Sequence, residues 1–235
     1  MAARTTGRPA KQRLLDAAER LFAKRGYHGV SIRDITDAAK LDVALVNYHF
    51  GNKRALLTSV FERRAEVLNR ERMERLEAVR IHAGGTLELE SVLNAFMEPL
   101  ILRSIRGGRG WKAYFALVAQ VNNSPELSAL MTRHFDPVVH KFIDVLLEAL
   151  PGADPRDVYW GYHFLTGALT LTFAETGRLD KLSGRLCRSS DLDAVHARFA
   201  PFMAAGLAML AERRCGATVR TKPPTRPGKR ISVPN

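Results

Sequence analysis

The chain has 235 residues, of which 46% are hydrophobic, and a formal net charge of +12. This length and apolar content allow one or two buried cores. Its two cysteines lie too far apart for a CxxC metal or redox motif, and neither a secretory signal nor an apolar run long enough to span a bilayer stands out. We therefore expect a cytoplasmic protein that needs no cofactor, binds no metal and has no membrane partner.

The positive charge is concentrated at the two ends of the chain. Residues 1–64 contain 13 basic and 6 acidic side chains, whereas residues 212–235 contain 7 basic and 1 acidic. The stretch between them is close to neutral. A basic terminal region is expected in a protein that displaces counterions from DNA, provided that a DNA-reading motif lies in the same region.

The segment RPAKQRLLDAAERLFAKRGYHG, residues 8–29, predicts a first helix that ends at Gly26. Pro9 suits its first turn and Gly26 suits its C-cap, because proline fixes a helical φ and glycine tolerates a left-handed one. Apolar residues recur between them at helical spacing. These are Leu14, Leu15, Ala18, Leu21 and Phe22.

Residues 31–50 predict two short helices joined by a turn too tight for anything except a helix-turn-helix. Ser31 is the expected N-cap of the first, with Asp34 completing a capping box. Asp42 is the expected N-cap of the second, in which Val46 and Phe50 are spaced to pack inward. The outward residues of this second helix would enter a major groove. They are Val43, Ala44, Asn47 and Tyr48.

This N-terminal region resembles the TetR/AcrR family of one-component transcriptional regulators. The matching residues are the helix that ends at Gly26 and Tyr27, then Ser31, Ile32, Ile35, Ala38 and Ala39, and then Tyr48, His49, Phe50, Gly51, Lys53 and Leu56. Together with the long helical patterns, the resemblance implies an all-α fold, in which an N-terminal three-helix helix-turn-helix DNA-binding domain precedes a larger helical ligand-binding and dimerisation domain. It also implies a phosphate contact for His49.

Two positions depart from the family pattern. Lys40 stands at the turn where many members have glycine, so a positive φ there would strain the backbone. Leu45 stands where many members have threonine or a similar polar residue, which makes the presented face more apolar.

The predicted DNA contacts follow from this arrangement. We expect Val43 and Ala44 to meet thymine methyl groups, and Asn47 to contact adenine in a bidentate manner or else to hold a phosphate. Lys53 lies in the first turn of the next helix, after the expected cap Asn52, where its charge and the backbone N–H groups can face a phosphate. The full predicted set is Arg8, Ser31, Arg33, Val43, Ala44, Asn47, Tyr48, His49 and Lys53.

Three regions are expected along the chain. Residues 1–52 form the DNA-binding domain with a basic arm, residues 53–214 form the effector-binding and dimerisation domain, and residues 215–235 form a basic disordered tail. In the second region the RGGRG segment at residues 106–110 is expected to be a loop, and Pro137 is expected to interrupt a helix. Kinks are expected at two further prolines. They are Pro99 and Pro201.

Two helical segments, residues 160–177 and 200–210, contain too many apolar residues for one chain to cover, and small residues among them permit close approach. We interpret them as the helices that each subunit contributes to a four-helix homodimer interface, with a buried intrachain core as the alternative. In a dimer, two recognition helices about 34 Å apart would contact a pseudopalindromic operator in double-stranded DNA.

The apolar, nearly neutral middle of the chain favours a small hydrophobic effector. The segments VNYHFGNK, PELSALMTRHFDPVVHKF and HFLTGAL resemble the fatty-acid-responsive branch of the family, which implies a fatty acid or acyl derivative. Its tail would lie among aromatic residues and its head group would meet a polar side chain. The predicted ligand-binding residues are Arg103, Trp111, Phe115, Gln120, Asn123, His134, Phe142 and Phe164.

These patterns predict a repressor that its effector releases from the operator. The alternative is an architectural DNA-binding protein without effector control, which would discriminate little between sequences. We do not expect an enzyme, because no GxSxG, HExxH, P-loop or GxGxxG motif occurs. An enzyme or carrier for a lipid-like substrate would need a convergent nucleophile and base that the sequence does not reveal.

Overall fold

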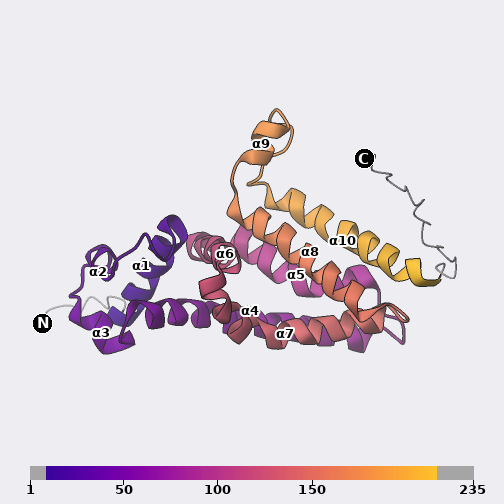
Figure 1. Cartoon of the computed structure of the whole chain (residues 1–235), viewed down its shortest axis with the longest axis horizontal. Helices are drawn as coiled ribbons and strands as arrows, with labels where there is room; N and C mark the ends of the chain where they lie inside the picture. The colour runs from indigo at the N-terminus through magenta and orange to yellow at the C-terminus, as the bar shows by residue number, and fades with distance from the viewer. Residues whose placement is uncertain (1–8, 216–235) are drawn as a thin grey trace, which may run out of the picture.

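The computed structural model of the chain describes residues 9–215, and side chains as far as Glu212. Within that range the chain forms ten α-helices and one short 3-10 helix, and no strand. They make a small N-terminal head and a larger helical body (Figure 1). The all-α expectation is therefore confirmed for this part of the chain. Arg8 and the predicted disordered tail beyond Cys215 lie outside the described residues.

The helices of the head follow the capping signals of the sequence. Ser31 Oγ accepts a hydrogen bond from the Asp34 N–H at 3.1 Å, and the Asp34 carboxylate accepts one from the Ser31 N–H at 2.8 Å, so the capping box is present. The carboxylate of Asp42 accepts a hydrogen bond from the N–H of Ala44 at 2.7 Å, although the helix's own N-cap position is Val43. The three helices are α1 (Ala10–Arg25), α2 (Ile32–Ala39) and α3 (Ala44–Phe50).

Lys40 makes the turn between α2 and α3 in the left-handed region, with φ 53 and ψ 51. Its N–H donates to the Asp37 carbonyl at 3.0 Å, and the Leu41 N–H donates to the Thr36 carbonyl at 2.9 Å. Arg13 of α1 also donates to the Lys40 carbonyl, at 3.2 Å. These bonds hold a conformation that costs a residue with a Cβ about 1–2 kcal/mol.

The core of the head is built from residues at i and i+4 spacing. Ile35 and Ala39 are buried on one face of α2, and Val46 of α3 is fully buried against them. Ala38, which the sequence pattern assigned to the same face, is exposed. One residue corresponds to about 100° of rotation, so Ala39 takes the inward position and Ala38 turns away.

The 30-residue helix α4 (Lys53–His82) joins the head to the body and lies beside α7 (Figure 1). Asn52 caps it by accepting a hydrogen bond from the Ala55 N–H at 2.9 Å. Its predicted apolar stripe packs inward except at Met73, which is exposed. Arg72 is buried instead, four residues from both Leu68 and Leu76.

Six more helices complete the body, and some of their bounds differ from the sequence expectation. The RGGRG loop is reduced to Gly107, because Gly108, with φ 78, already begins the next helix. Helix α7 continues through Pro137, since a proline removes one donor without ending a helix whose other turns are well packed. Pro99 and Pro201 also lie inside continuous helices.

One short helix, α9, was not expected from the sequence, and it protrudes between α8 and α10 (Figure 1). The elements are α5 (Leu89–Arg106), α6 (Gly108–Asn122), η1 (Pro125–Leu127), α7 (Ser128–Ala149), α8 (Pro155–Ala174), α9 (Arg178–Leu182) and α10 (Leu192–Cys215).

Helices α8 and α10 pack on each other and also leave apolar side chains uncovered (Figure 1). A Cβ on Gly161 would lie 2.2 Å from the Leu207 side chain, so this glycine permits the close intrachain contact. The uncovered side chains are each at least half exposed. They are Tyr159, Trp160, Phe164, Leu171, Phe202 and Met209.

One helix in the described part of the chain, α10, is as long and apolar as a membrane span, a property that core helices of soluble proteins share. By length and composition its residues Leu192–Glu212 could cross a bilayer, with a mean hydropathy of 1.3 and 17% burial. The apolar character comes from alanine, methionine and phenylalanine residues that face outward beside α8.

Candidate functional site

Helix α3 turns a continuous face away from the core of the head. Val43 is 41% exposed and Tyr48 is 81% exposed, and Ala44 and Asn47 are also exposed, whereas Val46 is fully buried. The four exposed residues are the ones that the sequence pattern placed outward. A short helix anchored on one side and open on the other has the shape needed to enter a major groove.

The other residues of the head that are predicted to contact DNA differ in how exposed they are and in the contacts they already make. Arg33 is exposed, and His49 is half-buried with its ring edge-on to Tyr48, at a centroid distance of 4.9 Å. The Ser31 hydroxyl donates to the Asp34 carboxylate at 2.5 Å. Its proton is therefore engaged in the capping box, and Ser31 is more strongly tied to positioning α2 than the sequence pattern indicated.

Lys53, which the sequence pattern assigned to a phosphate, also makes contacts within the head. Its ammonium donates to the carbonyls of Tyr27 and Val30, each at 2.8 Å, and lies 4.2 Å from the centroid of the Tyr27 ring. An ammonium has three donors, so at most one is left for DNA. Lys53 mainly ties the segment before α2 to the start of α4, a contact between residues 26 positions apart that helical spacing cannot reveal.

The joint between head and body is formed by ion pairs around a buried carboxylate. Glu19 of α1, which is 2% exposed, accepts hydrogen bonds from Arg63 at 2.6 Å and from Arg64 at 2.8 and 3.0 Å. On the body side, Gln120 of α6 donates to the carbonyl of Ala23 at 2.6 Å. Gln120, which the sequence analysis assigned to the ligand, therefore belongs to this joint.

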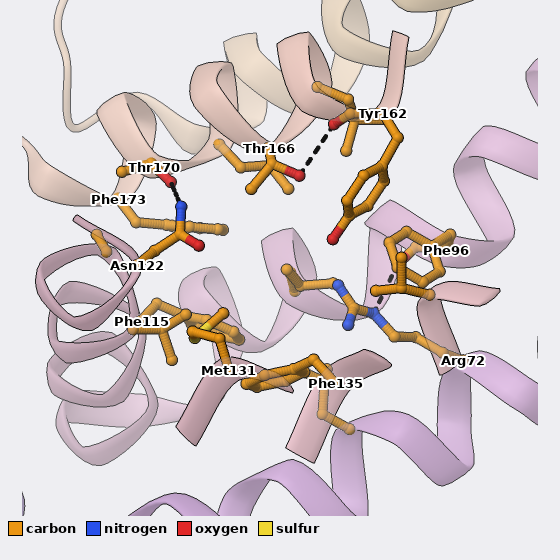
Figure 2. Close-up of a pocket in the computed structure, with 17 residues that line it drawn as sticks. Arg72, Phe96, Phe115, Asn122, Met131, Phe135, Tyr162, Thr166, Thr170 and Phe173 are labelled. Atoms are coloured by element: carbon orange, nitrogen blue, oxygen red, sulfur yellow. Dashed lines mark hydrogen bonds between the residues drawn. The ribbon is translucent and has the colours of Figure 1, made fainter. Parts of the chain in front are cut away.

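The body contains a largely apolar cavity between α4, α5, α6, α7 and α8 (Figure 2). Its volume of about 60 Å³ holds only a few water molecules. Any larger ligand must push its walls apart. The polar members of the lining are Arg72, Asn122, Tyr162, Thr166 and Thr170. The apolar members are Leu68, Phe96, Leu100, Phe115, Val118, Ala119, Met131, Phe135, Val139, Leu165, Leu169 and Phe173.

Of the eight predicted ligand-binding residues, Phe115 alone lines this cavity. Arg103 pairs with Glu71 at 2.7 Å and lies 4.6 Å from the centroid of the Trp111 ring, so both Arg103 and Trp111 are engaged outside it. Asn123 donates to the Ala119 carbonyl at 2.9 Å, which closes the end of α6.

The remaining three predicted ligand residues also lie elsewhere. Phe142 stacks on Phe96 at a centroid distance of 3.9 Å, behind the cavity wall, and Phe164 is 56% exposed on the outer face of α8. His134 is half-buried on α7, where burial lowers its pKa. The sequence pattern predicts that such residues are buried. It does not predict which of the buried residues line the cavity.

Arg72 is the cavity residue that the sequence analysis missed. It is 4% exposed, its Nε donates to the Phe96 carbonyl at 3.0 Å, and its guanidinium lies 4.0 Å from the centroid of the Phe96 ring. Burial lowers its pKa to about 10, which still leaves it charged at neutral pH. The available clue was a cation on the apolar stripe of α4, between Leu68 and Leu76.

Two family models match the chain. The model described as bacterial regulatory proteins of the tetR family matches residues 14–60, and the one described as tetracyclin repressor-like, C-terminal domain, matches residues 94–206. The protein belongs to the TetR family of transcriptional regulators, which bind DNA through the N-terminal helix-turn-helix and carry a C-terminal ligand-binding domain. No curated protein matches the chain.

Solved structures share the fold over most of their length. The fatty acid degradation regulator FadR from Bacillus halodurans is 16% identical, with a TM-score of 0.57 over 86% of this chain and 98% of that one. A regulator from Saccharomonospora viridis in complex with choline is 19% identical, with a TM-score of 0.54 over 83% and 95%. Salmonella enterica GusR is 20% identical, with a TM-score of 0.52 over 90% and 100%. At these identities the likeness establishes the shared fold alone.

Proposed function

We propose that the protein is a cytoplasmic, non-catalytic, homodimeric repressor, which leaves a pseudopalindromic operator when a small hydrophobic effector enters the body. The observation that carries this proposal is the position of α4. Its first residue, Lys53, anchors the recognition unit, while Leu68 and Arg72 further along the same helix line the cavity. One rigid element thus connects the two sites that an effector-controlled repressor must couple.

The small cavity gives the coupling a physical basis. A ligand of more than a few heavy atoms must move α4, α7 or α8, so it binds best to a body whose helices have already shifted. Because Glu19, Arg63 and Arg64 fix α1 to α4, a shift of α4 carries the head with it. The ligand would then favour a separation of the two heads that no longer matches the operator.

The exposed apolar face of α8 and α10 supports the homodimer. Aromatic side chains that are half exposed or more, such as Trp160, Phe164 and Phe202, lie on neighbouring helices. Contiguous apolar surface of this kind marks an interface in a soluble protein. A two-fold dimer through this face would cover it and would hold two copies of α3 in a symmetric pair.

On the DNA, Asn47 is the proposed base-reading residue, and Val43 and Ala44 the proposed contacts to thymine methyl groups. The test is selection of bound sequences from a random DNA pool, expected to yield an inverted repeat with A·T positions. Asn47→Ala should then cost about 1–3 kcal/mol on the selected site. The control Asn123→Ala, an exposed asparagine on the body, should bind the site like the wild type.

Lys53→Ala should weaken binding to all DNA to a similar extent, because the residue positions the head. A pool that yields no preferred sequence would contradict the repressor and favour the architectural alternative. Equal losses on every sequence for Asn47→Ala and Lys53→Ala would contradict the separate roles.

A further inference from the structure

The geometry points to an amphipathic monocarboxylate as the effector, with its head group on Arg72 at the buried end of the cavity and its hydrocarbon tail directed toward Asn122. This inference rests on the proposed function, because it assigns the effector class of the same cavity. It places the head group on a residue that the sequence pattern did not indicate.

The first argument is that Arg72 is a buried cation without a counter-ion. Among the residues that the structure describes, no carboxylate lies within ion-pair distance of it, and its hydrogen bond to the Phe96 carbonyl uses Nε alone. Two other arginines of the same helix that are only partly exposed, Arg63 and Arg64, both pair with Glu19. A charged group taken out of water is normally paired, so the free fork of Arg72 is suited to an anion supplied from outside.

The second argument is the set of polar groups around that fork. Figure 2 shows the Tyr162 hydroxyl, on α8, and the Arg72 guanidinium, on α4, directed into the same space. Tyr114 lies close enough to Arg72 for the two to interact electrostatically, and its buried hydroxyl has no hydrogen-bond partner in the described part of the chain. A guanidinium fork with a phenol beside it can donate to both oxygens of a carboxylate.

The third argument concerns the opposite end of the cavity. Among the described residues that line the cavity, Asn122 alone is exposed, and its amide donates to the Thr170 hydroxyl at 3.2 Å (Figure 2). Between this end and Arg72 the lining is almost wholly apolar, with Phe115, Met131 and Phe135 on one side. A tail anchored at Arg72 would therefore run through apolar surroundings to the solvent-facing end.

The number of charges favours a monoanion, of which a carboxylate is the most compact, over a phosphate monoester. A single guanidinium neutralises one negative charge, whereas a phosphate monoester would bring a second charge into an apolar enclosure without a partner. A bulky head group would have to be accommodated at the buried end, in addition to the opening that the tail already requires. A coenzyme A thioester, which lacks a free carboxylate and carries such a head group, should not bind in this orientation.

The experiment compares sodium dodecanoate, 1-dodecanol and dodecanoyl coenzyme A on the delipidated full-length protein by titration calorimetry. We expect dodecanoate to bind about 10- to 100-fold more tightly than dodecanol, the range for a hydrogen-bonded charge pair, and the thioester to bind no better than dodecanol. Octanoate and hexadecanoate should show that affinity rises with chain length until the tail reaches solvent.

Variants assign the preference to one residue. Arg72→Gln should abolish the preference for the acid and leave the affinity for dodecanol within about threefold, whereas Arg72→Lys should retain part of it. The control is Arg70→Gln, which removes an exposed arginine of the same helix and should change neither affinity. If Arg72→Gln does not fold, the comparison of the three ligands on the wild-type protein still tests whether the cavity prefers a carboxylate.

Several results would overturn the inference. They are equal binding of the acid and the alcohol, tight binding of the thioester, no binding of any of the three, or the same loss in Arg70→Gln as in Arg72→Gln. Measuring whether each ligand releases the protein from its operator distinguishes a failure of the carboxylate assignment from a failure of the proposed function. If dodecanol alone releases the protein from its selected DNA, the effector-controlled repressor stands and the carboxylate assignment falls.

Discussion

Glu19 of α1 and Arg64 of α4 form a two-pronged ion pair, with Nε and Nη2 of the arginine donating to the two carboxylate oxygens at 3.0 and 2.8 Å. The same carboxylate accepts a hydrogen bond from Arg63, and the Arg64 guanidinium lies 4.7 Å from the centroid of the Trp111 ring on α6. The head, the connecting helix and the body thus meet at one acidic residue. This fixes the orientation of α1 relative to α4 and α6.

Replacing Glu19 with glutamine should lower the free energy of unfolding by about 2–4 kcal/mol. The substitution leaves Arg64 without its counter-charge and leaves Arg63 paired with Asp16 alone, and the cost of breaking a fully buried pair is reduced here because both arginines are about one-fifth exposed. Urea denaturation monitored by circular dichroism measures the loss. Asp37→Asn, which neutralises an exposed acid of the head, is the control, and an equal effect of both variants would contradict the role given to Glu19.

Gly110 provides a second test of the same joint. A Cβ at this position would lie 2.4 Å from Nη2 of Arg64 and 3.1 Å from Oε1 of Glu19, so Gly110→Ala should displace the arginine from its partner. We expect the variant to be destabilised and, in a double-mutant cycle, to add less than its separate cost to Glu19→Gln. Fully additive losses would show that the two residues do not act on one ion pair.

The head could be predicted from the sequence because its determinants act locally. The capping box of Ser31 and Asp34, and the inward spacing of Val46 in α3, involve residues within a few positions of each other. The cavity could not, because Arg72 and Tyr162 are brought together from distant helices by packing. A pattern also cannot distinguish Phe115, which lines the cavity, from another buried phenylalanine that supports its wall.

Lys40→Gly should stabilise the protein by about 0.5–1 kcal/mol. Glycine removes the steric cost of φ 53 at the turn, although part of that gain is lost to the greater entropy of the unfolded chain. Thermal or urea denaturation checks the sign. Lys40→Asn, which tolerates the left-handed region and also removes the charge, should lie close to the wild type, whereas Lys40→Val should be clearly destabilised. Destabilisation by glycine would show that the side chain itself is needed.

Two glycines of α8 should respond in opposite ways to alanine. At Gly161 the added Cβ would meet the Leu207 side chain at 2.2 Å, so overpacking between α8 and α10 should cost about 1–3 kcal/mol. At Gly167 the added Cβ meets no described atom within 4 Å, so the higher helix propensity of alanine should stabilise an isolated chain by up to about 1 kcal/mol.

Gly167 also tests the proposed dimer, because it is exposed on the same helix as Phe164 and Leu171. Gly167→Arg should shift the protein toward monomers in analytical ultracentrifugation, since a charged side chain would be forced into an apolar interface. The far-ultraviolet circular dichroism spectrum should stay that of a folded helical protein. A variant that remains dimeric at low protein concentration would place the interface elsewhere.

His134 should make the stability depend on pH near neutrality. Burial lowers its pKa below the ordinary value of 6.5, and its Nε2 has no hydrogen-bond partner in the described part of the chain. Between its folded pKa and 6.5 the unfolded state binds more protons than the folded state, so the stabilisation is complete above about pH 6.5 and decreases as the pH falls toward the folded pKa. Urea unfolding at several pH values gives the pH dependence of the free energy of unfolding for the wild type and for His134→Gln. The variant should lose less stability on acidification.

The control is His140→Gln, which replaces an exposed histidine of the same helix and should follow the wild-type pH profile. If His134→Gln also follows that profile, the acid sensitivity arises from other groups and His134 is not desolvated in solution.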